Sequence, residues 1–166
     1  MALDLSERFK YVQSDRDFPI DWPGLSTSVV RSDEKYLWSP AFCAARKVGL
    51  LIHGRIRLSS AEWAKAETLP LQGGLAAKFL LDAWLSGGEQ ALVSRHNGAG
   101  AIVLWEIDSQ ELHIWTDKLG VVPIYHPHES VSPWAISSHP DVLADWLTVE
   151  GSPPKLDFTS MAESLS

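Results

Sequence analysis

The single cysteine of this 166-residue chain, Cys43, is the first residue whose chemistry could be catalytic. A cysteine becomes a nucleophile where a cationic, partly exposed setting favours its thiolate, and Arg46 and Lys47 follow closely in the sequence. Its immediate neighbours are alanines and a phenylalanine, which instead favour a structural thiol packed among apolar groups. One cysteine cannot form a disulfide within the chain, which fits a reducing compartment.

Histidines form a second pattern that could bind a ligand. His126, His128 and His139 are close in sequence, and positions 126 and 128 would share one face of a strand, as metal ligands require. Pro127 lies between them, and turn-forming residues follow. We therefore interpret these histidines as surface residues of a hairpin loop and expect no metal site.

A glycine-rich segment forms the third pattern. Asn97-Gly98-Ala99-Gly100 is superficially like a phosphate-binding loop. Dinucleotide-binding loops follow a strand and precede a helix, whereas the order of the elements expected here is reversed. We interpret the segment as a tight turn that leads into a buried strand.

Apolar periodicity predicts the helices that would position these residues. Ser59 and Glu62 have the spacing of a capping box, which predicts a short helix from this point. The apolar stripe from Leu75 to Trp84 predicts a stronger helix that ends at Gly87-Gly88, with a further helical turn over 89–95. A closing helix is expected from Asp141 to Leu147.

The strands are predicted from shorter apolar runs. Val48–Ile52 indicates a buried strand that is closed by a turn at His53-Gly54. Residues 99–107 are apolar at positions facing both ways, which predicts a strand between two layers. A turn at 108–110 and alternation over 111–116 make an antiparallel hairpin of this strand and the next.

Composition excludes several classes of protein. The formal charge is −7 and no run of Lys and Arg exceeds two residues, so we expect no nucleic-acid partner. The longest apolar stretch is too short to span a bilayer, and the first ten residues do not have the pattern of a signal peptide. These features predict a cytoplasmic protein that does not bind membranes.

The segment 116–125, Thr-Asp-Lys-Leu-Gly-Val-Val-Pro-Ile-Tyr, is the most specific motif of the chain. It follows a helix, an Asn-Gly turn and a buried strand that ends in Trp105-Glu106. This order resembles the glutaminase domain of asparagine synthases and of their relatives, the β-lactam synthetases and lasso-peptide cyclases. Their Arg-Asp-x-x-Gly-x-x-Pro-Leu-Tyr loop corresponds to 116–125, and their Asn-Gly-Glu-Ile turn to His53-Gly-Arg-Ile56. The resemblance covers roughly residues 48–147.

The resemblance implies an α+β fold, specifically the four-layer αββα sandwich of N-terminal-nucleophile hydrolases. It places a glutaminase-like domain at residues 1–147. The polar, proline-rich segment that follows would be a linker and the start of a truncated synthetase domain, at residues 148–166.

The resemblance also implies where catalytic residues would stand, and the chain departs from the family there. The family's nucleophile is an N-terminal cysteine, whereas this sequence begins Met1-Ala2. The oxyanion-hole asparagine is replaced by His53, although the adjacent glycine is kept as Gly54. Loss of one oxyanion donor costs about 100-fold or more in rate. Acids of the family are also missing here. The acid that follows the glycine corresponds to Arg55, the Asp that would hold the glutamine amine falls near Ala76, and a nearby Glu corresponds to Lys78.

We therefore expect no catalytic residues, only vestigial oxyanion-hole positions, in an amidotransferase-like domain of an asparagine synthase-like, ATP-dependent amide-forming enzyme. Its partner would be the synthetase domain of the same polypeptide, and ATP and Mg²⁺ are expected only for that domain. Two alternatives stay open: an active amidohydrolase that uses Cys43, and a free-standing, non-catalytic binding module. The sequence leaves open whether the protein is a homo-oligomer.

Overall fold

The computed structural model describes residues 20–22, 25–27, 40–127 and 135–153. The chain forms two compact units, residues 1–123 and 124–166. The fold is α+β, as the sequence predicts. Its elements are β1 (Ile20–Trp22), β2 (Leu25–Thr27), β3 (Ala41–Cys43), β4 (Val48–Ile56), α1 (Ser60–Thr68), β5 (Gln72–Gly73), α2 (Leu75–Arg95), β6 (Gly98–Glu106), β7 (Glu111–Trp115) and α3 (Pro140–Val149).

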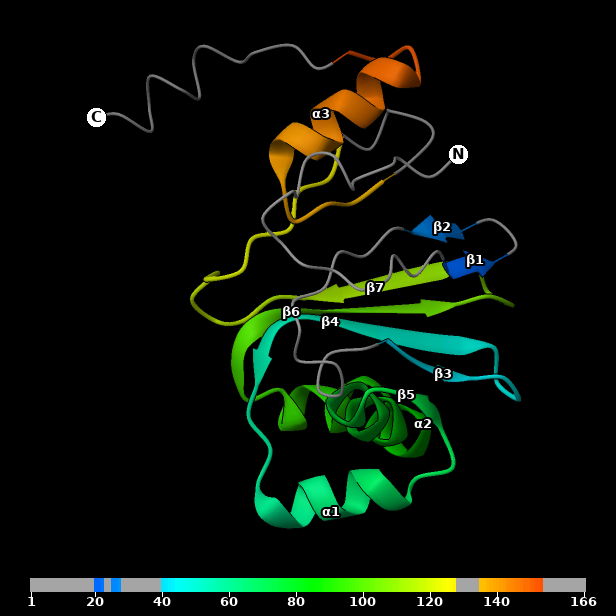
Figure 1. The fold of residues 1–166 in the computed structure, drawn as a ribbon, viewed down its shortest axis with the longest axis vertical. Helices are drawn as coiled ribbons and strands as arrows, with labels where there is room; N and C mark the ends of the chain where they lie inside the picture. The colour runs from blue at the N-terminus through cyan, green and yellow to red at the C-terminus, as the bar shows by residue number, and fades with distance from the viewer. Residues whose placement is uncertain (1–19, 23–24, 28–39, 128–134, 154–166) are drawn as a thin grey trace. The chain divides into compact units, whose positions relative to one another are not determined.

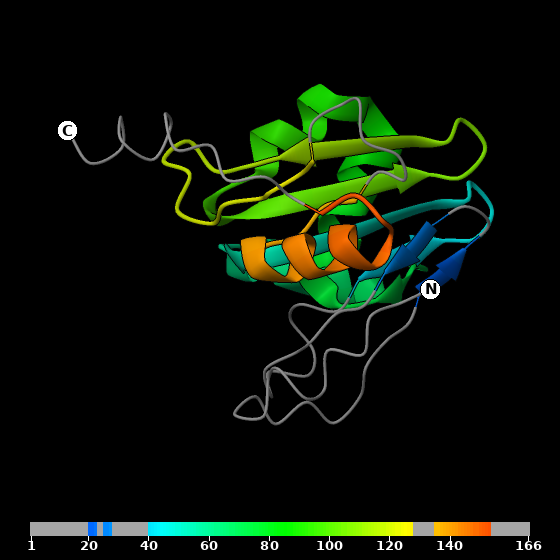
Figure 2. The same cartoon turned by 90° about the horizontal axis from the view of Figure 1, so that it is seen from above.

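The first unit is built on a five-stranded sheet of order β5-β3-β4-β6-β7, in which every neighbouring pair is antiparallel. The longest pairing joins β4 to β6, from Val48 opposite Glu106 to Ile56 opposite Gly98. Figure 2 shows β4, β6 and β7 running beside one another. Strands β1 and β2 form a separate antiparallel pair.

Helices α1 and α2 lie on the same side of the five-stranded sheet (Figure 1). Helix α2 packs on β3, β4 and β5, and α1 packs on α2. The apolar core lies between α2 and the sheet. Its largest fully buried side chains are Leu50, Leu80, Leu81, Leu92, Ile102 and Leu104.

Strand β6 is buried on both faces. Ile102 and Leu104 belong to the core on the side of the helices. The alternate residues Ala101, Val103 and Trp105 face the other way and are also buried. The prediction of a strand apolar and shielded on both sides is therefore confirmed, as is its hairpin with β7.

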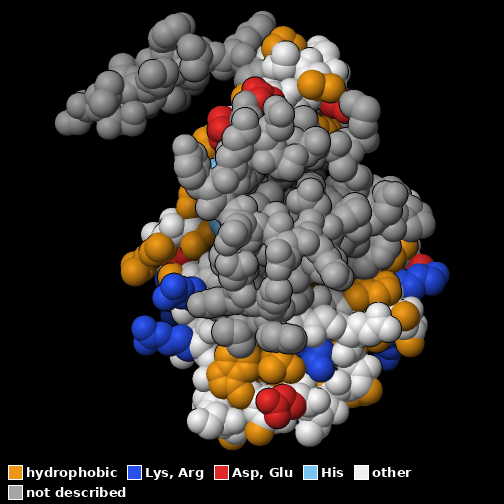
Figure 3. Space-filling view, viewed as in Figure 1, with side chains coloured by type: hydrophobic (Ala, Val, Ile, Leu, Met, Phe, Trp, Pro, Cys, Tyr) orange, Lys and Arg blue, Asp and Glu red, His pale blue; other side chains and the backbone are white. Residues whose placement is uncertain are grey.

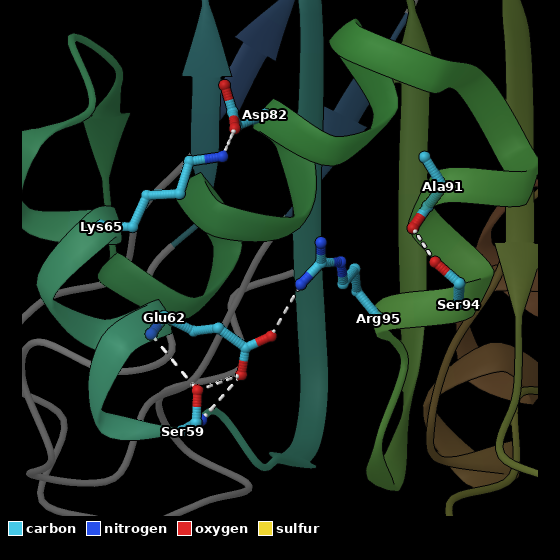
Figure 4. Close-up of polar contacts among 7 residues, drawn as sticks. All are labelled: Ser59, Glu62, Lys65, Asp82, Ala91, Ser94 and Arg95. Carbon is cyan, nitrogen blue, oxygen red and sulfur yellow. Dashed lines mark hydrogen bonds and ion pairs between the residues drawn. The ribbon is translucent and has the colours of Figure 1, made fainter.

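Helix α1 begins with the predicted capping box. The Ser59 N–H and hydroxyl each donate to Glu62 Oε2 at 2.8 Å, and the Glu62 N–H donates back to Ser59 Oγ at 3.4 Å (Figure 4). This exchange satisfies backbone donors that the first turn of a helix leaves without partners.

Helix α2 consists of two segments separated by a kink. Gly87 and Gly88 have non-helical backbone angles, and φ is +64° at Gly88, a conformation that glycine adopts most readily. The helix predicted to end at this glycine pair does so, and the expected turn over 89–95 is a second helical segment.

The predicted turn at His53-Gly54 is wrong, because β4 continues through both residues to Ile56. Gly54 adopts φ +110° and lies opposite Gly100, so the glycine serves a close approach between two strands. In the second unit, Tyr125 and Ser137 form an isolated antiparallel bridge. The closing helix is confirmed as α3.

The predictions for Ala2 and His128, and for residues 154–166 of the expected linker and synthetase start, concern residues outside the described ranges.

The burial of β6 predicts the cost of opening a cavity there. Leu104→Ala removes a fully buried side chain and should lower the free energy of unfolding by about 2–5 kcal/mol. The matched control is Leu119→Ala, because Leu119 is 87% exposed and its loss should change stability by less than about 0.5 kcal/mol. Urea denaturation measures both, and equal effects would contradict the assigned core.

Candidate functional site

The motif loop after β7 is organised by one carboxylate, that of Asp117. Its Oδ1 accepts from the N–H groups of Leu119 at 3.0 Å and Val121 at 3.1 Å. Its Oδ2 accepts from the N–H of Val122 at 3.3 Å. The Gly120 N–H donates to the Asp117 carbonyl oxygen at 3.0 Å, and φ at Gly120 is +61°. The Asp117 carboxylate therefore ties together three backbone N–H groups of the loop.

These hydrogen bonds stabilise the ionised form of Asp117. The N–H of Val121 makes the largest contribution and lowers the pKa of the carboxyl group from its ordinary value of 3.8. Partial desolvation opposes this shift, while the N–H groups of Leu119, Val122 and Gly100 add to it. Asp117 thus has a structural role, because both oxygens of its carboxylate accept hydrogen bonds from backbone N–H groups.

The loop lies beside the part of the β4–β6 pairing where Gly54 is opposite Gly100. A Cβ atom built on Gly54 would lie 2.5 Å from the Ala99 carbonyl oxygen, 2.7 Å from the Gly100 Cα and 3.1 Å from a methyl group of Val122. The Gly100 carbonyl oxygen lies 3.1 Å from the His96 Nε2. We name Gly54, Gly100 and the loop 117–122 the glycine seat.

Gly54, which the resemblance places with His53 at an oxyanion-hole position, belongs to this seat. Because Ile52 and Ile56 point into the helix-side core, the alternating residues His53 and Arg55 project from the opposite face of β4. Both side chains are exposed. Gly54 lies beside the motif loop, because a Cβ built on it would be 3.1 Å from a methyl group of Val122.

Ala76 and Lys78 lie elsewhere. Both belong to α2, Ala76 is fully buried in the core with Ile52, and Lys78 is 9% exposed. The Lys78 Nζ donates to the Leu69 carbonyl oxygen at 3.3 Å, at the C-terminal end of α1. The sheet therefore separates these two side chains from that of His53, and no common site forms from them.

Cys43 ends the short strand β3, is half-buried, and packs against the core. Its carbonyl oxygen accepts from the Arg46 N–H at 3.3 Å in the turn that follows. Lys47 instead forms an ion pair with Asp108 at 2.7 Å. These contacts are those of a strand end and its turn.

The histidine pattern does not converge on a metal site in the described ranges. His126 Nδ1 lies 2.9 Å from the Pro127 carbonyl oxygen, and His139 Nδ1 lies 2.9 Å from Ser138 Oγ. Over residues 40–127 and 135–153, the structure contains no group of three His, Cys, Asp or Glu side chains suited to a metal ion. No helix among those residues is long and apolar enough to cross a membrane.

A second feature was not predicted from the sequence. A pocket of about 210 Å³ lies between α1 and the two segments of α2. Its ion pairs join Lys65 to Asp82 and Arg95 to Glu62 (Figure 4). These partners are 17 and 33 residues apart, so a local sequence pattern could not predict them. On the face shown in Figure 3, the Lys and Arg side chains of the described residues lie among other side-chain types and form no continuous basic surface.

Comparison with known protein families, with curated proteins and with solved structures finds no match.

The hydrogen bonds of Asp117 predict a pH-dependent contribution to stability. Since the folded-state pKa is below the ordinary value of 3.8, the stabilisation is fully present above about pH 4 and is lost as the pH falls through the folded-state value. Asp117→Asn should melt below wild type at pH 7, and the difference should shrink from pH 4 to pH 2.5. Asp108→Asn is the control, because Asp108 forms an exposed ion pair with Lys47. A constant difference for Asp117→Asn would contradict the assignment.

The glycine seat predicts that Gly54 cannot carry a side chain. Gly54→Ala places Cβ within 2.7 Å of β6 backbone at φ +110°, so it should lower the melting temperature strongly. Gly120→Ala is the matched control: φ there is +61° and nothing lies within 4 Å of the added Cβ. It should cost only about 1 kcal/mol. Similar losses in the two variants would show that the seat is not close-packed.

Proposed function

We propose that this chain is a glutaminase-like domain of an asparagine synthase-like, ATP-dependent amide-forming enzyme, and that it has no glutaminase activity. The observation that carries the proposal is the glycine seat. The motif loop that resembles the family packs on Gly54, the residue kept from the family's oxyanion turn. The order of helix, buried strand, hairpin and anchored loop also fits this class.

The proposed fold is the four-layer αββα sandwich. Its support is the double burial of β6, with Leu104 facing α2 and Val103 and Trp105 buried on the opposite face. A strand with two buried faces needs a covering layer on each side. The sheet with α1 and α2 would supply two of the four layers.

Charge explains why glutamine would not bind. The free amino acid carries an α-ammonium group, which a site recognises with carboxylates. At the corresponding positions this chain carries a cation, Arg55, and the buried methyl group of Ala76. Lys78 is also cationic and its Nζ is engaged by Leu69. The domain therefore lacks the acids that would hold the substrate's ammonium group.

In this proposal the domain acts as a scaffold for the synthetase domain, which would supply the sites for ATP and Mg²⁺. No residue of this chain is assigned to either ligand. The anchored loop and the sheet would shape or cover the synthetase active site rather than release ammonia.

Glutamine tests the proposal directly. Isothermal titration of the 166-residue chain with L-glutamine should give no binding heat, and an ammonia assay should give no release above buffer. Treatment with a diazoketone analogue of glutamine, followed by mass spectrometry, should give no adduct that is absent from the Cys43→Ser variant. Ammonia release or a specific Cys43 adduct would favour the amidohydrolase instead.

The coding sequence after Ser166 tests whether a synthetase domain belongs to the same polypeptide. A Ser-Gly-Gly-x-Asp-Ser loop should follow, since the proposed partner adenylates a carboxylate at such a loop. A reading frame that stops without a synthetase domain would leave the free-standing binding module.

A further inference from the structure

The pocket between α1 and α2 has an apolar floor. Phe79, Ala83 and Ala91 line it, and the kink at Gly87 opens it between the two helical segments. A Cβ on Gly87 would lie 2.8 Å from that of Ala91, so the glycine keeps the two segments close. Small side chains on both segments thus leave a hollow over a buried aromatic ring.

Two cations flank this hollow. Lys65 Nζ lies 5.7 Å, and Arg95 Cζ 5.5 Å, from the centroid of the Phe79 ring. Their side chains are 56% and 51% exposed, whereas those of their partners Asp82 and Glu62 are 26% and 27% exposed. The positive ends are therefore more accessible to a ligand than the carboxylates that balance them.

Both cations can turn to a ligand at small cost. An exposed ion pair contributes little to stability, and a new charge-assisted hydrogen bond to a ligand can replace it. Glu62 has partners besides Arg95, because its Oε2 accepts two hydrogen bonds from Ser59. Glu62 stays satisfied in its capping box if Arg95 moves away.

We propose that this pocket binds a small carboxylic acid, with its carboxylate between Lys65 and Arg95 and its apolar body over Phe79, Ala83 and Ala91. An anion is favoured over a cation because the exposed charges of the rim are positive. A short unbranched or planar body suits the volume of about 210 Å³. This inference goes beyond the proposed function and does not depend on it.

Three probes that contain four carbon atoms each, butanoate, butylammonium and 1-butanol, separate the contributions of charge and apolar contact. Titration of the full ¹⁵N-labelled chain should show saturable shifts for butanoate at the Gly87 and Gly88 amides. Butanol should bind more weakly, and butylammonium most weakly. Equal or tighter binding of butylammonium at these amides would overturn the proposal.

Variants identify the two cations. Lys65→Gln and Arg95→Gln should each weaken butanoate binding about tenfold, because each removes one charge-assisted hydrogen bond. Lys47→Gln is the matched control, since Lys47 is also 56% exposed and pairs with an aspartate at 2.7 Å. Unchanged affinity in the Lys65 and Arg95 variants, or an equal loss with Lys47→Gln, would show that anions do not bind at this pocket. Melting temperatures verify that all three variants are folded.

Discussion

The antiparallel pairing of β4 with β6 is the constraint on which the described fold depends. Its register runs without a break from Val48 opposite Glu106 to Ile56 opposite Gly98. A slip by one residue would turn the core side chains of β4 to the other face of the sheet. The same register sets Gly54 opposite Gly100, which determines where the motif loop can rest. Core and candidate site are therefore specified together.

In the candidate site, the residues that fix the backbone differ from those that could supply reactive groups. The carboxylate of Asp117 is occupied by backbone donors, and Gly54 is required by steric contact. Neither role needs a substrate. His53 and Arg55 project from the strand with exposed side chains, outside the apolar core. Such a site can lose its reactive groups and keep its shape.

Local interactions made much of the fold predictable from sequence. Ser59 and Glu62 indicated the start of α1 because a capping box lies within one turn, and alternation indicated the β6–β7 hairpin. The full length of β4 could not be predicted. The pair His53-Gly54 is typical of a turn, and it continues the strand because Gly54 pairs with Gly100 of β6. The pocket was equally hidden, because its ion pairs exist only once α1 packs on α2. The four-layer arrangement and the glutaminase-like identity remain predictions.

The position of both helices between β4 and β6 in the chain has a consequence for folding kinetics. The two central strands can pair only after the intervening segment closes as a loop, and closing long loops slows folding. The β6–β7 hairpin closes over only a few residues, so it should form before β4 joins it. Until β4 arrives, β6 is an open sheet edge, which makes the partly folded chain prone to self-association.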